Sequence, residues 1–167
     1  MASRTCWTVS MVVMAPSEKA GRMLLLDVNV LVYAFRPDQS TSARATRDWL
    51  DRTMTAGQPV AVTEESLVAT IRISTHPGIF EQPAPPRDAL AFVEALRDAP
   101  LTRVLRPSSR HWAIFRAFVD DLRLVGNDVP DASLAALAID RGAALVTTDR
   151  GFRRFPGLST LDPTLPA

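Results

Sequence analysis

Three aspartates, Asp27, Asp131 and Asp149, carry the strongest chemical signal in this sequence. Asp27 and Asp149 each follow an apolar run typical of a buried strand, and Asp131 opens a helical stretch. In an open parallel sheet the functional crevice lies outside the carboxyl ends of the strands. Carboxylates gathered there repel one another unless a cation neutralises them, and oxygen-only ligand sets suit Mg²⁺ or Mn²⁺. The pattern therefore indicates metal-assisted chemistry on a phosphate ester.

Each of these aspartates also has a purely structural explanation. Asp27 is placed to cap the following helix, Asp131 to complement the dipole of its own helix, and Asp149 to form a turn in an Asp-Arg-Gly bend. For Asp27 alone the two explanations are equally good. The alanine-rich helix behind Asp131 favours a site role, because small residues let that helix pack closely against a sheet.

Polar neighbours of these acids would complete such a site. Asn29 is placed to hydrogen-bond Asp27 or a water, and Thr147 or Thr148 to bond the Asp149 carboxylate or a phosphate oxygen. Asp128 is interpreted as a turn residue that reaches a metal only through a water.

The elements that must position these residues alternate between strand and helix. Apolar runs predict strands at 23–26, 59–62, 102–105, 143–148 and 158–161. Helical spacing and capping residues predict helices at 28–35, 41–54, 64–74, 87–98, 130–141, and from Ser108 or Ser109 to 123. This alternation favours the α/β class: a three-layer α/β/α domain around a mostly parallel sheet of four to five strands.

Composition narrows the alternatives. The 167 residues predict one domain over 23–167, preceded by an extension at 1–22 that is disordered or reflects a mis-assigned start. A secretory signal in that extension is not favoured, so we expect a cytoplasmic protein without a membrane span. With the single cysteine Cys6 and only two histidines, a Cys- or His-based metal site is not expected. The formal net charge of +1 leaves nucleic-acid contact to a local arginine patch.

Several segments share their order and spacing with one known family. These are Asp27 to Ala34, Arg72 to Pro77, Asn127 to Ala138, and Thr147 to Phe152 followed by Phe155 to Gly157. Together they resemble the PIN-domain ribonucleases, specifically the VapC-type toxins of type II toxin–antitoxin pairs. The second segment and Phe155–Gly157 look most like the mycobacterial subset, and the resemblance runs from Met23 to about Pro163.

This resemblance implies an endoribonuclease dependent on Mg²⁺, with Mn²⁺ as the alternative ion. Asp27, Asp131 and Asp149 would hold the metal, and hydrolysis would leave 5′-phosphate and 3′-hydroxyl ends. It also implies a homodimer and a cognate VapB-type antitoxin, whose C-terminal segment covers a groove walled by the helices at 41–54 and 64–74. Cleavage of a structured RNA such as tRNA or rRNA would inhibit growth.

The chain departs from the family pattern at the second acid. The corresponding position in the helix at 64–74 holds Ala69. Glu65 lies four residues earlier, on the same helical face, whereas Glu64 projects about 100° away. Glu65 is therefore the candidate fourth acid, and a solvated first-turn residue is the equal alternative. The missing acid motivates a second hypothesis, a catalytically weakened PIN scaffold that acts through partner binding.

The arginines have both site and structural interpretations. Arg72 would contact a phosphate or orient a site carboxylate, or else form a structural ion pair. Arg150, Arg153 and Arg154 would cradle an RNA backbone, or else lie in a solvated loop. A phosphatase of the haloacid-dehalogenase type is disfavoured, because Asn29 stands where that chemistry needs a second aspartate.

Overall fold

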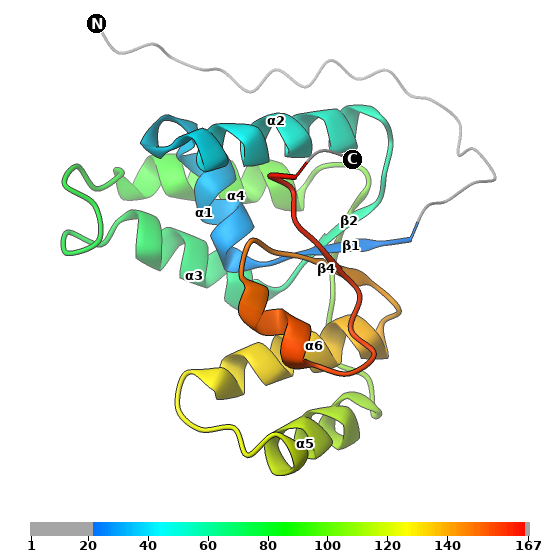
Figure 1. The fold of residues 1–167 in the computed structure, drawn as a ribbon. Helices are drawn as coiled ribbons and strands as arrows, with labels where there is room; N and C mark the ends of the chain where they lie inside the picture. Colours follow the sequence, from blue (N-terminus) through cyan, green and yellow to red (C-terminus); the bar gives the residue numbers. More distant parts are fainter. Residues whose placement is uncertain (1–21, 166–167) are drawn as a thin grey trace, which may run out of the picture.

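Five parallel strands form a single sheet through the middle of the protein (Figure 1). The computed structural model describes residues 22–165, so the predicted extension at 1–22 lies outside the described residues except for Arg22. The strand order is β3-β2-β1-β4-β5 and every pair is parallel. The strands are β1 (Leu24–Leu26), β2 (Val60–Val62), β3 (Thr102–Val104), β4 (Ala144–Val146) and β5 (Thr160–Leu161).

Helices cover both faces of this sheet. One group comprises α1 (Val28–Phe35), α2 (Thr41–Thr55), α3 (Glu64–Ser74) and α4 (Pro86–Arg97). The other group comprises α5 (His111–Asp121) and α6 (Asp128–Asp140), and Figure 1 shows the two groups on opposite sides of the strands. Two short 3-10 helices complete the fold, η1 (Pro37–Gln39) and η2 (Arg150–Arg154). The predicted three-layer α/β/α architecture is confirmed.

Alternation along the strands separates two hydrophobic cores. Leu25 pairs with Leu145, and both pack with α6 in one cluster. Leu26 pairs with Val146, and both pack with α1 in the other cluster. Successive side chains of a strand point to opposite faces of a sheet. Burial on both faces explains why these strands read as unbroken apolar runs.

Three helices begin at other residues than the sequence predicts, and α4 differs least, starting one residue early at Pro86. Helix α6 starts at Asp128, two residues before the predicted start at Pro130, so Asp128 lies in its first turn. Proline is tolerated there because the N–H groups of a first turn have no partner within the helix. Helix α5 starts at His111, because Ser108 donates its backbone N–H and its hydroxyl to the Asp140 carboxylate.

The topology places a crevice beside β1. After β1 the chain builds outward through β2 and β3, then crosses to β4 on the other side of β1. This reversal is the position where open α/β sheets bind ligands, outside the carboxyl ends of the strands. Asp27 directly follows β1, and Asp149 lies three residues beyond β4. Among the described residues, no helix has the length and apolar character needed to cross a bilayer.

Candidate active site

Asp27 is fixed at the end of β1 by hydrogen bonds to both carboxylate oxygens. The backbone N–H of Val28 donates to Oδ1 at 2.6 Å, which makes Asp27 the N-cap of α1. Oδ2 accepts from Asn29 Nδ2 at 2.6 Å and from the Thr147 hydroxyl at 2.7 Å. The side chain is only 5% exposed. Asp27 therefore caps α1 and also lies at the carboxyl end of β1, where the strand order of the sheet reverses.

Asn29 and Thr147 tie the end of β1 to the end of β4. Asn29 Nδ2 also donates to Thr147 Oγ1 at 3.0 Å, and Asn29 Oδ1 accepts weakly from the Thr148 N–H at 3.4 Å. Thr147 Oγ1 in turn accepts from the Asp149 N–H at 3.0 Å. The network therefore fixes the backbone of Asp149 relative to the carboxylate of Asp27. Thr147, one of the two predicted threonines, bonds Asp27 rather than the Asp149 carboxylate.

Burial makes the charge on Asp27 unfavourable. It raises the pKa of the carboxyl from 3.8 to about 6, although the hydrogen bonds from Thr147 and Val28 act in the opposite direction. The charges of Asp131 and Asp149 raise the pKa further. These two acids therefore lie near enough to Asp27 to repel it. The three aspartates from three different elements share one electrostatic environment.

Asp131 is paired with a cation of the protein itself. Arg154 donates from Nη2 to Asp131 Oδ2 at 3.1 Å and contacts Asp128 Oδ1 through Nη1 at 2.9 Å. All three side chains are between one third and one half exposed. Partial burial raises the pKa of Asp131, Arg154 lowers it, and Asp149 and Asp128 raise it again, with a net upward direction.

Arg154 therefore holds the first turn of α6 at the site through two ion pairs, a structural role that differs from both interpretations of the sequence, an RNA contact or a solvated loop. The signal that separates it is helical geometry. Side chains three residues apart overlap in a 3-10 helix, so Arg150 and Arg153 share a face while Arg154 points elsewhere. Asp128 likewise joins the site through this ion pair, which the turn interpretation did not foresee.

Asp149 is the most exposed of the three aspartates. Its Oδ1 accepts from the Gly151 N–H at 2.7 Å, so it caps η2. The absence of a side chain at Gly151 favours this close approach, because a Cβ there would lie 3.0 Å from the same oxygen. The turn role predicted for Asp149 is therefore real, and its second carboxylate oxygen faces no hydrogen-bond donor within the described residues.

The predicted fourth acid does not join this group. Glu65 lies exposed on α3, and its charge is not among those that raise the pKa of Asp27 or Asp131. Glu64 is half-buried and pairs with Arg97 at 3.4 Å. Arg72 is exposed at the end of α3, and within residues 22–165 no hydrogen bond or ion pair holds its guanidinium group. The site roles predicted for Glu65 and Arg72 remain predictions.

The donor chemistry of the site fits a hard divalent cation, but the side chains do not form a closed cage. Asp27, Asp131 and Asp149 supply only oxygen ligands, and their mutual repulsion raises the pKa of Asp27 and of Asp131. In the described part of the chain, no three His, Cys, Asp or Glu side chains are grouped so that they could hold a metal ion as they stand. The Asp131 carboxylate is turned to Arg154 instead.

A parallel sheet with aspartates beyond the ends of its central strands is characteristic of one known protein family. Residues 24–158 match the PIN domain family, so the chain belongs to that family. It is 41% identical over 141 residues to VapC ribonuclease Mb2897 of Mycobacterium bovis, an alignment covering 84% of this chain and 95% of that protein. It is 37% identical to ribonuclease VapC25 of Mycobacterium tuberculosis, covering 86% of this chain and all of that protein. The resemblance to the mycobacterial VapC proteins is confirmed.

Solved structures share the fold at lower identity. The crystal structure of DNA-bound VapBC from Salmonella typhimurium aligns with a TM-score of 0.61 at 21% identity, covering 86% of this chain and 99% of that one. At that identity the likeness supports the arrangement of helices and strands alone.

Proposed function

We propose that this protein is a metal-dependent endoribonuclease and the toxin of a toxin–antitoxin pair. One observation carries the proposal: Asp27 after β1, Asp131 in α6 and Asp149 after β4 lie near the reversal point of the sheet, where the charges of Asp131 and Asp149 raise the pKa of Asp27. The membership in the PIN domain family and the names of the VapC relatives support the ribonuclease assignment.

The aspartates would hold the ion, and their neighbours would orient them. Asp27 and Asp149 offer carboxylate oxygens directly, and Asp131 offers one when Arg154 releases it. Mg²⁺ or Mn²⁺, when bound, would lower the pKa of a water and offset charge on the scissile phosphate. Asn29 and Thr147 keep the Asp27 carboxylate in one orientation. Residues 22–165 contain no cysteine or lysine, and no serine in that range hydrogen-bonds one of the three acids, so water is the expected attacking group.

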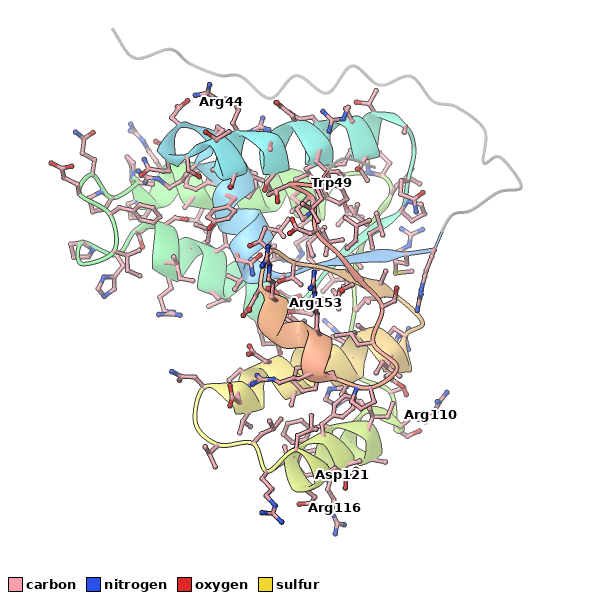
Figure 2. All side chains as sticks on the ribbon, in the orientation of Figure 1. Arg44, Trp49, Arg110, Arg116, Asp121 and Arg153 are labelled. Atoms are coloured by element: carbon pink, nitrogen blue, oxygen red, sulfur yellow. The ribbon has the colours of Figure 1, made fainter. Side chains whose placement is uncertain are left out.

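Cleavage of RNA by the purified full chain tests the proposal. We expect total RNA to be cut with Mg²⁺ or Mn²⁺ present, and the new ends to be 5′-phosphates and 3′-hydroxyls. EDTA and the Asp27→Asn substitution should each abolish cutting. Asp121→Asn is the matched control, because Asp121 is exposed at the far end of α5 (Figure 2). Cutting that persists unchanged in Asp27→Asn would reject the enzyme and favour a scaffold that acts by binding.

The toxin role adds partners, which we infer from the same relatives. We propose a homodimer in the cytoplasm, neutralised by a VapB-type antitoxin whose segment lies in a groove between α2 and α3. Val68 on α3 is 64% exposed and would supply apolar contact there. Expression of the wild type should stop growth, and expression of Asp27→Asn should not. Light scattering of the purified chain should give the mass of a dimer, and a monomer mass would remove that part of the proposal.

A further inference from the structure

A small cavity lies beside the aspartates, between η2 and the carboxyl ends of β4 and β5. Its volume is about 160 Å³. We call it the arginine pocket, and its lining includes Thr148, Asp149, Arg150, Arg153, Thr160 and Asp162. In Figure 2 Arg153 extends from η2 toward the strands in the middle of the molecule. Asp149, one of the three site aspartates, also lines this cavity.

The 3-10 geometry of η2 explains why two cations meet in this cavity. Arg150 and Arg153 are three residues apart, and side chains at that spacing overlap in a 3-10 helix. Both arginines are exposed, and in the part of the chain that the structure describes neither forms an ion pair. Arg154, one residue further, points to α6 instead. The pocket therefore holds two guanidinium groups that form no ion pair with a carboxylate of the described residues.

The acids of the pocket already have other partners. Asp149 Oδ1 accepts from the Gly151 N–H. Asp162 Oδ1 accepts from the Thr164 N–H at 2.9 Å and from the Thr164 hydroxyl at 2.6 Å. These bonds come from Gly151 and Thr164, and among the described residues neither carboxylate forms an ion pair with Arg150 or Arg153. The guanidinium groups remain available to an anion from outside, and paired planar donors suit the oxygens of a phosphate.

We propose that the arginine pocket binds a backbone phosphate of single-stranded RNA, adjacent to the phosphodiester that lies over the aspartates. This inference rests on the proposed ribonuclease function and extends it to how the strand is held. A polyanion is repelled by the carboxylates of Asp27 and Asp149, which no ion pair of the described residues offsets, so a cationic contact is needed next to them. The overall charge of the chain does not supply that attraction, but Arg150 and Arg153 supply it locally.

Binding of a labelled single-stranded RNA oligonucleotide to the full chain in EDTA tests the proposal, because EDTA prevents cutting. Fluorescence anisotropy at several salt concentrations gives the affinity and its salt dependence. For the double variant Arg150→Gln and Arg153→Gln we expect affinity to fall roughly 10- to 100-fold. The slope of log K against log salt should become shallower by about 0.7 for each phosphate that the variant no longer neutralises. A double lysine variant should keep the slope while binding more weakly, since lysine retains the charge without the planar fork.

Arg110→Gln is the matched control, since Arg110 is an exposed arginine at the start of α5 (Figure 2). If the double glutamine variant matches this control in both affinity and slope while the wild type binds and cuts RNA, the pocket inference alone is overturned. If the wild type neither binds nor cuts RNA, the proposed function fails and the pocket inference fails with it. Added inorganic phosphate should displace RNA from the wild type but not from the double glutamine variant. Polyglutamate is the competing ligand. If the double glutamine variant loses affinity for polyglutamate but keeps the wild-type affinity for RNA, the pocket binds an acidic protein segment and the RNA proposal is rejected.

Discussion

Asp27 and Asp131 lie at the same edge of the sheet, each at the start of a helix, but they are held in opposite ways. Asp27 is 5% exposed and receives three hydrogen bonds from neutral groups, and no cation of the described residues pairs with it. Asp131 is about one third exposed and is paired with the charged Arg154. The pKa of Asp27 rises to about 6, whereas Arg154 lowers the pKa of Asp131 and limits its upward shift.

This difference separates two tasks within one site. Hydrogen bonds orient the Asp27 carboxylate but leave its charge uncompensated, so a cation from solution gains most there. The charge of Asp131 is already offset by Arg154, which must release it before it can serve an external ion. The difference predicts that Asp27 dominates cation affinity while Arg154 opposes it at Asp131. Substitutions on each side of the site can test the two halves of this statement separately.

The largest effect is expected for Asp27→Asn, which should inactivate the protein while stabilising it. The folded pKa of about 6 exceeds the unfolded value of 3.8, so between these pH values the folded chain keeps a proton that the unfolded chain has lost. Stability therefore falls as pH rises through that window and stays reduced above it. The cost of the ionised carboxylate is at most about 3 kcal/mol, and the amide removes it.

Urea unfolding in EDTA at two pH values measures this effect. At pH 7.5 we expect Asp27→Asn to be more stable than the wild type, and at pH 4 the gain should vanish. The gain will be smaller than the upper limit, because an amide cannot accept from Val28, Asn29 and Thr147 together. RNA cleavage should fall by at least about 100-fold, because substitution of a residue that only hydrogen-bonds a metal ligand already lowers activity 10- to 100-fold. If Asp27→Asn is less stable than the wild type at pH 7.5, the ionised Asp27 carboxylate does not destabilise the folded chain.

Thr147→Val tests the hydrogen bonds on the Asp27 side. The hydroxyl donates to Asp27 and lowers its pKa, so its loss should raise that pKa further and weaken cation binding by roughly 10- to 100-fold. Stability at neutral pH should fall by about 1–2 kcal/mol. Calorimetric titration with Mn²⁺ at several pH values should show binding that begins at higher pH than in the wild type.

Thr46→Val provides the control for this substitution. Thr46 is fully buried on α2, and its hydroxyl has no hydrogen-bond partner among the described residues, so the same chemical change there should leave cation binding unaltered. Equal losses in the two variants would mean that the Thr147 effect is a general packing defect.

The sequence predicted the Asp27 side of the site far better than the Asp131 side. Unbroken apolar runs mark the buried strands, and a polar residue after such a run falls at the sheet edge whatever the rest of the chain does. That local logic predicts the hydrogen bond from Asn29 to Asp27, but it assigns Thr147 to the Asp149 carboxylate or a phosphate, whereas the Thr147 hydroxyl donates to Asp27. Parallel pairing of β1 with β4 then brings Thr147 to Asp27, although 120 positions separate them in the chain.

The Asp131 side depends on packing between elements, which spacing alone does not determine. The ion pairs of Arg154 require η2 to lie against the first turn of α6, 23 residues earlier in sequence. They also require α6 to begin at Asp128, which the proline at 130 concealed. For Glu65, helical spacing shows which residues of α3 share a face with it. It does not show which face of α3 points to the site. The face that α3 buries runs through Ser66, Leu67 and Thr70, and Glu65 lies outside it.

Arg154→Met tests the competition at Asp131. Loss of two partly exposed ion pairs should cost about 1 kcal/mol at low salt, and less as salt increases. With Asp128 and Asp131 released, Mn²⁺ should bind roughly fivefold more tightly, as removal of a nearby positive charge predicts. Calorimetric titration with Mn²⁺ measures this change directly.

Arg116→Met is the matched control, since it breaks an exposed pair with Asp120 on α5. Its Mn²⁺ affinity should equal that of the wild type. Weaker Mn²⁺ binding in Arg154→Met would reverse the interpretation, because Arg154 would then hold Asp131 in place for the ion.

The smallest effect is expected for Gly151→Ala, which shifts Asp149 without removing a charge. The new Cβ would lie 3.0 Å from Asp149 Oδ1, so this carboxylate must move by a few tenths of an ångström. We expect a loss of a few-fold in Mn²⁺ affinity and RNA cleavage, with a stability change within about 0.5 kcal/mol. Gly78→Ala is the control, because its Cβ would crowd only the exposed His76 side chain at 3.1 Å. If Gly151→Ala binds Mn²⁺ and cuts RNA as well as Gly78→Ala, the exact position of the Asp149 carboxylate does not limit either activity.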